Sequence, residues 1–231
     1  MRMIKQGNLY QLTFLPGFFP VNCYFVDERD GLTLIDAALP NSADGIATAA
    51  RKVGKSIRRI VLTHAHSDHI GALDKLKQMY PDVPVYISRR DARLLSGDLT
   101  IDANEPKTPI KGGVPKPHAI KTTPDVLLDD GSRVGSLLAI WTPGHTPGSM
   151  SFLDTRTQYL IAGDAFQTRG GFAVTGQLRP LFPFPAMATW NKELGMESAH
   201  KIRVYQPELL AVGHGNVLAQ PVEHIDRALG I

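Results

Sequence analysis

Histidine and aspartate side chains gather in one short stretch of the sequence, Thr63-His64-Ala65-His66-Ser67-Asp68-His69. The stretch follows a run rich in Ile and Val that predicts a buried strand. Because alternate side chains of an extended backbone point to the same side, His64 and His66 form half of a metal site. Asp68 and His69 come where the chain bends into a helix, so they face a different point. The stretch therefore predicts ligands for two metal ions.

Three more candidate ligands each stand directly after a predicted strand, and these are His145, Asp164 and His214. Strand ends on one edge of a sheet converge on a shared cleft, so we expect these side chains to join the first four. The glycines beside them let the backbone pass close to a ligand cluster. Asp36 also ends a strand, and we expect it either to accept a hydrogen bond that orients a ligand or to cap a turn.

The elements that must position these residues alternate between strands and helices. Short β-rich runs and turn residues predict strands at 9–15, 21–26, 32–35, 57–62, 84–87, 131–142 (a pair), 150–153, 159–162 and 209–212. Apolar spacing and capping residues predict helices at 41–53, 69–80, 89–95, 189–204 and 221–229. Segments rich in Gly and Pro at 97–117 and 167–185 predict loops. The order predicts one domain, 1–231, with two halves, about 1–115 and 116–231.

The composition is that of a folded chain, with 231 residues, 43% hydrophobic and 20% charged. Such a chain buries a sizeable core, which excludes intrinsic disorder as its main state. The single cysteine, Cys23, excludes an internal disulfide framework and a cysteine-based zinc knuckle, and its apolar strand favours a core thiol. The sequence holds no Gly-x-Ser-x-Gly motif, which argues against a serine nucleophile. Imidazole and carboxylate groups must carry the chemistry.

The formal charge of +3 carries little information about partners. Lys and Arg crowd the segment 51–59, but no aromatic residue interleaves with them, which favours a solvated helix end over a nucleic-acid surface. No apolar run approaches the roughly 18 residues of a membrane span, and polar residues break the segment 1–12 where a signal peptide would be apolar. We expect a cytoplasmic protein that acts on a small molecule, with no nucleic-acid or membrane partner.

Aromatic residues concentrate in two segments outside the ligand set. The candidates for an apolar pocket above the metals are Phe18, Phe19, Phe166, Phe172, Phe182 and Phe184. Packing of the domain edge or a homodimer contact would use the same rings. If the rings form a pocket, the substrate has an apolar part beside its scissile bond.

The ligand series resembles the motifs of the metallo-β-lactamase superfamily. The resemblance extends from about Asn22 to His214 and rests on order, spacing and the local contexts Gly-His-Thr-Pro-Gly and Gly-Asp, for the residues Asp36, His64-x-His66-x-Asp68-His69, His145, Asp164 and His214. It implies an α/β fold, an αβ/βα four-layer sandwich of two mixed β-sheets with helices on the outer faces. It also implies that His64, His66 and His145 hold one metal and that Asp68, His69 and His214 hold the other, with Asp164 bridging both.

The same resemblance implies a hydrolase in which metal-bound hydroxide attacks a small ester, thioester, lactone or amide, with Asp68 taking part in proton transfer. Two divalent ions are expected, zinc first, with iron or manganese also suited to these ligands. A persulfide dioxygenase-like oxidoreductase with one iron, or a β-lactamase, is the alternative. The branch that resembles glyoxalase II and the lactonases shares the full ligand set. Lactonases, however, carry a tyrosine soon after the bridging Asp, where Phe166 and Gln167 stand here.

Overall fold

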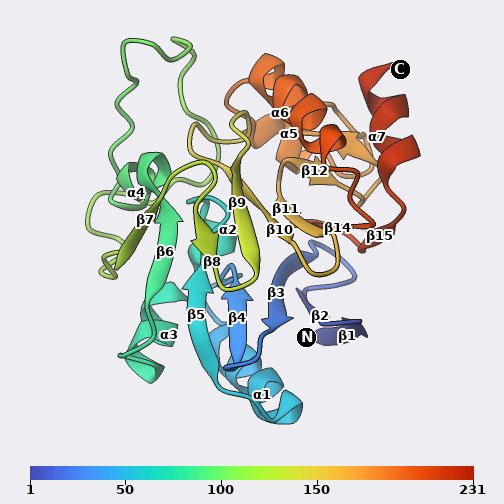
Figure 1. Ribbon diagram of the computed structural model, residues 1–231. Coiled ribbons are helices and arrows are strands. Elements are labelled where there is room, and N and C mark those ends of the chain that lie inside the picture. The colour runs from blue at the N-terminus through green and yellow to red at the C-terminus, as the bar shows by residue number, and fades with distance from the viewer.

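Two β-sheets lie face to face at the centre of the structure, a computed structural model that describes residues 1–231 (Figure 1). The first sheet pairs, in this order, β1 (Arg2–Gln6), β2 (Leu9–Phe14), β3 (Val21–Asp27), β4 (Leu32–Ile35), β5 (Ile57–Val61), β6 (Val85–Ser88) and β7 (Val126–Leu128). The second has the order β15-β14-β11-β10-β9-β8, with β8 (Arg133–Val134), β9 (Leu137–Trp141), β10 (Met150–Asp154), β11 (Tyr159–Gly163), β14 (Leu209–Val212) and β15 (Leu218–Ala219). A separate pair joins β12 (Phe166–Gln167) and β13 (Ala173–Val174).

Helices cover the outer face of each sheet. The helices of the chain are α1 (Ala43–Val53), α2 (Ser67–Ile70), α3 (Leu73–Met79), α4 (Arg89–Leu95), α5 (Phe184–Ala188), α6 (Lys192–Val204) and α7 (Val222–Leu229). One apolar cluster packs α1, α3 and α4 on the first sheet, and another packs α6 and α7 on the second (Figure 1). A third cluster fills the space between the sheets.

The central strands are apolar on both faces because both faces are covered. In β5, Ile60 packs outward against the helices and Val61 packs inward against the other sheet. In β11, Leu160 packs outward against the helices and Ile161 packs inward against the other sheet. Each strand side chain alternates between two buried environments, so the strands read as continuous apolar runs. The αβ/βα four-layer sandwich of two mixed sheets expected from the sequence is confirmed.

Strand directions bring the candidate ligands to one edge of the sandwich. In the first sheet β4 runs parallel to β5, so the ends that carry Asp36 and the His64 stretch lie side by side. In the second sheet β9, β11 and β14 all point the same way, because β9 and β11 each pair antiparallel with β10 and β14 pairs parallel with β11. His145, Asp164 and His214 therefore leave their strands at a common edge.

Several elements differ from the sequence-based prediction. The segment 167–185, predicted as a loop, contains β13 and the start of α5, and the short strands β12 and β15 were not predicted. The exposed edge strand β1 was not predicted, because its polar residues carry no burial pattern, and neither was the short β7. The helix predicted at 69–80 is two helices, since Gly71 N–H donates to the Ala38 carbonyl and interrupts the helical ladder. The first sheet extends to Leu128, so the chain divides between the sheets after that residue and not near 115.

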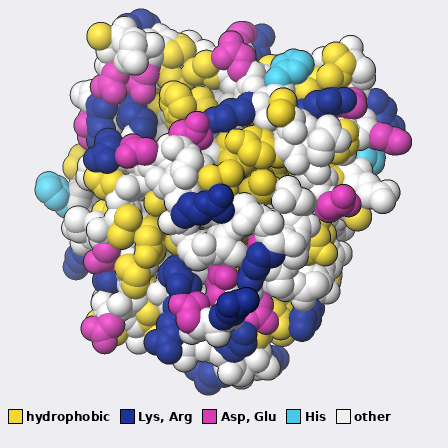
Figure 2. Space-filling model, viewed as in Figure 1, with side chains coloured by type: hydrophobic (Ala, Val, Ile, Leu, Met, Phe, Trp, Pro, Cys, Tyr) yellow, Lys and Arg dark blue, Asp and Glu magenta, His cyan; other side chains and the backbone are white.

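Charged side chains of both signs lie side by side on the surface. Within the basic segment 51–59, Lys55 pairs with Asp27 and Arg59 pairs with Asp30. On the face in Figure 2, Lys and Arg side chains stand beside Asp and Glu in the same way. None of the helices is both long and apolar enough to span a bilayer.

Candidate metal centre

Seven side chains from four segments of the chain converge in one cluster at this edge. Three overlapping groups have their ligand atoms within 4.8 Å of one another, and they are His64, His66 and His145; His64, His69 and Asp164; and Asp68, His69 and His214. Six of the seven residues are buried, and Asp68, with its side chain 24% exposed, faces solvent. The structure thus brings together all seven of the ligands expected from the sequence, and their metal-binding roles stay a prediction.

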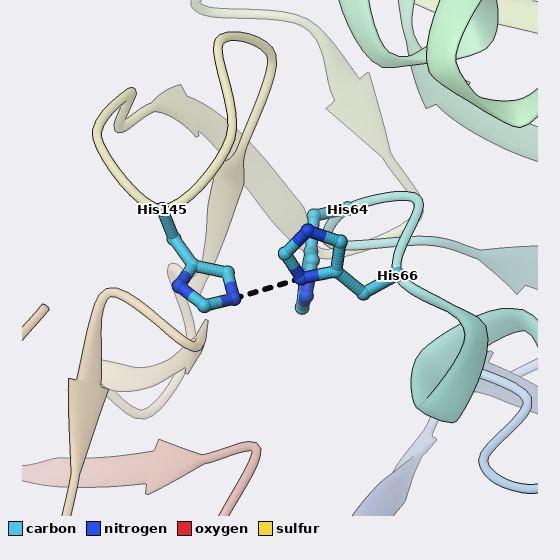
Figure 3. Close-up of side chains that lie close together, drawn as sticks. All are labelled: His64, His66 and His145. Atoms are coloured by element: carbon cyan, nitrogen blue, oxygen red, sulfur yellow. Dashed lines mark hydrogen bonds between the residues drawn. The ribbon is translucent and has the colours of Figure 1, made fainter. Parts of the chain in front are cut away.

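The first group is built entirely from imidazoles, which Figure 3 shows turned toward one another. His66 Nδ1 lies 2.9 Å from His145 Nε2. The ring centroid of His64 lies 4.8 Å from that of His66 and 4.9 Å from that of His145. His64 and His66 come from the turn after β5, whereas His145 comes from the loop after β9, so the group joins the two sheets.

Asp164 lies between the first group, His64 with His66 and His145, and the second group, Asp68 with His69 and His214. Its Oδ2 lies 3.3 Å from His145 Nε2 and 3.2 Å from His214 Nε2, and its Oδ1 lies 3.5 Å from His69 Nε2. Asp68 Oδ2 lies 3.4 Å from His214 Nε2 on the far side of the second group. A carboxylate between two sets of nitrogen ligands is positioned to serve both.

Each imidazole has a hydrogen-bond partner on the nitrogen that faces away from the cluster. The pairs are His64 Nδ1 with Thr63 Oγ1, His66 Nε2 with the Lys111 carbonyl, His69 Nδ1 with Asp36 Oδ2, His145 Nδ1 with the Thr175 and Thr189 hydroxyls, and His214 Nδ1 with the Pro20 carbonyl. Such outer partners fix the tautomer and the ring orientation of metal-ligating histidines. The inner nitrogens of the rings consequently face one another and the carboxylates within the cluster, where a cation can be held.

Three buried polar atoms in the cluster have no hydrogen-bond partner, and they are His64 Nε2, His69 Nε2 and Asp164 Oδ1. A buried polar atom without a partner costs free energy, so a native site that keeps three of them together calls for a ligand. A cation would satisfy all three. Imidazole nitrogens with carboxylate oxygens and no thiolate suit zinc, iron or manganese. The residues present therefore fit the metal that the sequence predicted.

The two groups differ in their proton affinity. Burial lowers the pKa of His145 to about 3 and also lowers that of His64. Burial acts in the same direction on His69, but the charges of Asp164 and Asp68 outweigh it and raise its pKa to about 9. The same two carboxylates raise the pKa of His214 against the effect of burial. The first group is a neutral nitrogen site and the second combines nitrogen with carboxylate charge.

Asp36 holds the start of the histidine stretch in place. Its carboxylate accepts hydrogen bonds from Thr63 N (2.7 Å), Thr63 Oγ1 (2.8 Å) and His69 Nδ1 (2.9 Å). The backbone of Asp36 has φ 63°, a left-handed conformation that Asp tolerates better than most residues. Asp36 therefore contacts both a candidate ligand and the loop that carries it, as the first of its two expected roles requires.

The glycine at 213 is required by the cluster. A Cβ there would collide with Asp164 Oδ1 and lie 2.7 Å from His69 Cε1. The backbone after β14 thus passes against the candidate ligands, as the flanking glycines predicted.

A cavity of about 410 Å³ opens over the cluster. Asp68, His66, His145, Asp164 and His214 form its floor, and its apolar wall consists of Phe19, Phe184, Pro185, Met187 and Ala188. The cavity gives a small molecule access to the candidate ligands, with an apolar surface along one side.

Only part of the predicted aromatic pocket lies at this cavity. Phe19 and Phe184 line it, and Phe182 packs behind them with its ring centroid 5.3 Å from that of Phe19. The prediction is wrong for the other rings.

Phe166 is buried in the core between the second sheet and its helices, where Phe172 packs against it, because β12 turns that ring away from the cluster. Phe18 projects into solvent and is 85% exposed, since Phe19 alone of the pair faces inward.

Sequence reasoning missed the outer partners of the histidines. The Lys111 and Pro20 carbonyls carry no sequence signal, because every residue has one. Thr175 and Thr189 lie far along the chain from His145 and carry no motif. The position of Thr63 directly before His64 was the one local signal available.

Comparisons with known proteins agree with this geometry. Residues 16–214 match the family model of the metallo-beta-lactamase superfamily. The chain is 56% identical to uncharacterized protein YobT of Bacillus subtilis (strain 168) over 229 residues, 99% of this chain and 97% of that protein. It is 35% identical to probable metallo-hydrolase YflN of the same organism over 215 residues, 84% of this chain and 80% of that protein.

Among solved structures, TTHA1623 in a di-iron-bound form superposes with a TM-score of 0.66 and 25% sequence identity, covering 93% of this chain and 96% of that one. The fold, the ligand cluster and the match over most of the sequence lead to the same conclusion. The chain belongs to the metallo-beta-lactamase superfamily.

Proposed function

We propose that this protein is a dinuclear metal-dependent hydrolase that cleaves a small ester, thioester, lactone or amide with an apolar group beside the scissile bond. The observation that carries the proposal is the set of three unpartnered buried atoms, His64 Nε2, His69 Nε2 and Asp164 Oδ1. These three residues form one of the three overlapping groups, and the other two groups, His64 with His66 and His145 and Asp68 with His69 and His214, share no residue, which supports two ions and not one.

His64, His66 and His145 would hold one cation, and Asp68, His69 and His214 the other, with Asp164 between them. Zinc is the first candidate, and iron is the second because the structural neighbour TTHA1623 has a di-iron-bound form. When bound, two divalent cations lower the pKa of a water molecule toward 7 and polarise the oxygen of the scissile group.

Asp68 is the residue best placed to move a proton. It is the one candidate ligand with substantial exposure, and it lies on the floor of the cavity. His214 Nε2, 3.4 Å away, and His69 hold its pKa below the usual range although burial acts to raise it. An ionised carboxylate facing the substrate can accept a proton from the attacking group and return it to the leaving group.

The apolar wall determines which part of the substrate enters beside the cluster. Phe19, Phe184 and Met187 line one side of the cavity and would contact a hydrocarbon group. Burying such a group contributes about 25 cal/mol per Å² and removes water from the reacting bond. An acyl chain or ring next to the carbonyl fits this wall.

The test is elemental analysis of the purified protein followed by assays on an ester, a thioester, a lactone and a β-lactam. We expect about two metal ions per chain and turnover of an apolar ester-type substrate. One iron per chain with oxygen uptake would instead indicate an oxidoreductase and contradict the proposal. Two ions with turnover of the β-lactam alone would contradict the proposed substrate class.

A further inference from the structure

Asp91 lies outside the seven-residue cluster, in the first turn of α4, and its side chain is completely buried. It forms no salt bridge, so its hydrogen bonds provide its polar contacts. Oδ2 accepts from Ala65 N (2.9 Å) and from Thr146 Oγ1 (2.8 Å), and Oδ1 accepts from Gly148 N (2.8 Å). All three donors lie in segments that carry candidate ligands.

These donors belong to different sheets. Ala65 stands between His64 and His66, after β5 of the first sheet. Thr146 and Gly148 follow His145, after β9 of the second sheet. One carboxylate therefore bonds to both backbone segments that supply the first ligand group.

The position of Asp91 is itself fixed. Its backbone N–H donates to Ser88 Oγ (3.0 Å), the residue that caps α4. Gly148 packs so closely that a Cβ there would lie 2.6 Å from Asp91 Oδ1. A carboxylate held by a helix cap and a tight backbone contact provides a rigid reference point for the two segments.

A simple packing role does not account for a charged group at this position. Burial raises the pKa of Asp91 to about 6, although the hydrogen bonds from Thr146, Ala65 and Gly148 act to lower it. A buried carboxylate without a cationic partner is costly, and an apolar residue would fill the space at lower cost. Only a carboxylate has enough acceptor oxygens to bond to Ala65 N, Thr146 Oγ1 and Gly148 N at the same time.

We propose that Asp91 is a positioning residue that sets the spacing of His64 and His66 relative to His145 and so tunes the affinity of the first cation site. The inference rests on the proposed function. Asp91 does not touch the cavity, and it acts through the two ligand segments.

The test is the variant Asp91→Asn, because an amide has one acceptor oxygen and must turn its NH₂ toward at least one of the three donors. Two Zn²⁺ affinities would be measured by competition with a chromophoric chelator. We expect one ion to bind about 10- to 100-fold more weakly and the other to change by less than about threefold. The Co²⁺-loaded variant should show an altered d–d absorption spectrum.

Asp154→Asn is the matched control. Asp154 is also a buried carboxylate that accepts several hydrogen bonds, from Asn8 and Arg156, but it lies far from the cluster at the end of β10. It should leave both Zn²⁺ affinities unchanged even where it lowers the Tm. If Asp91→Asn fails to fold, Thr146→Val removes one donor and should weaken the same ion by a smaller factor.

Failure of the proposed function and failure of the role of Asp91 give different results. Wild-type protein that holds fewer than two Zn²⁺ per chain overturns the proposed function and the inference with it. Wild-type protein with two Zn²⁺, together with variants that weaken both ions equally or neither, overturns the role of Asp91 alone.

Discussion

At the scale of single residues, Asp164 connects the two ligand groups. His145 lies on one side of its carboxylate and His214 and His69 lie on the other, at 3.2–3.5 Å. The charges of His214, His69 and His145 hold its pKa well below the usual range although burial acts to raise it. An ionised, buried carboxylate in this position is suited to hold two cations at once.

We therefore expect Asp164→Ala to lower the metal content to one ion per chain or less and to reduce hydrolysis by at least about 100-fold, because both cations lose a ligand. The fold should survive, since Asp164 lies on a loop end and outside the three apolar clusters. Elemental analysis, activity and far-UV circular dichroism are the measurements. A fully loaded, active variant would contradict the bridging position.

The aromatic rings make a second prediction at this scale. Phe184 lines the cavity and is 49% exposed, whereas Phe18 is 85% exposed and does not line it. Phe184→Ala should raise KM for an apolar ester by about 5- to 30-fold, the equivalent of about 1–2 kcal/mol of lost apolar contact, and should affect a polar ester less. Phe18→Ala is the matched control and should leave KM unchanged. Equal effects of Phe184→Ala on both esters would assign the ring to packing instead.

At the scale of elements, the segment 96–125 between α4 and β7 supplies the Lys111 carbonyl to His66 without any helix or strand of its own. Asp74 of α3 anchors the C-terminal part of this segment. Its carboxylate accepts from Lys121 N, Thr122 N and Thr122 Oγ1. A segment that carries an outer partner of a candidate ligand is thus tied to the first sheet through one helix.

This anchor should depend on pH. Burial acts to raise the pKa of Asp74, but the hydrogen bonds from Thr122 and Lys121 outweigh it and lower the pKa. For a carboxyl group with a lowered pKa, the contribution to stability is present above the unfolded-state value of about 4 and is lost as the pH falls below it.

Asp74→Asn should therefore lower the free energy of unfolding at pH 7 by at most about 1 kcal/mol, since solvent screens this partly exposed group. The difference from wild type should shrink as the pH falls below about 4. Urea denaturation at several pH values is the measurement, and a difference that grows at low pH would refute the anchoring role.

At the scale of the whole molecule, each ligand group takes residues from both sheets. The turn after β5 supplies His64, His66, Asp68 and His69, and the second sheet supplies the rest. Backbone and side-chain bonds reinforce this edge, with Asn22 N donating to the Gly213 carbonyl and the Tyr24 hydroxyl to the Val212 carbonyl. Cations bound here would join the two halves of the sandwich.

Metal removal should therefore destabilise the folded protein. A ligand present at 100 times its Kd stabilises by about 2.7 kcal/mol, which for a chain of this size corresponds to a fall of about 5–10 °C in Tm when a chelator removes it. Differential scanning calorimetry with and without EDTA measures the shift. His145→Ala should show a smaller chelator effect, and an unchanged wild-type Tm would contradict a link between metal binding and the fold.

The sequence by itself determined the chemistry and the general architecture. The seven candidate ligands were readable because each stands at a fixed place after an apolar strand run, and strand ends converge whatever the details of packing. Most strands and helices followed from apolar spacing and turn residues. Elements without a burial signal, such as the polar edge strand β1, did not.

Only the tertiary structure decided which neighbours support those ligands. The Pro20 and Lys111 carbonyls bond to histidines that are distant in sequence, and the Asp91 carboxylate bonds to the backbone between His64 and His66, through contacts that no local pattern encodes. The sequence also could not predict which way an aromatic ring faces. Phe166 packs in the core and Phe19 lines the cavity, and both positions remove an apolar ring from water. Local patterns specify which residues are buried, and the packing of two sheets specifies against what.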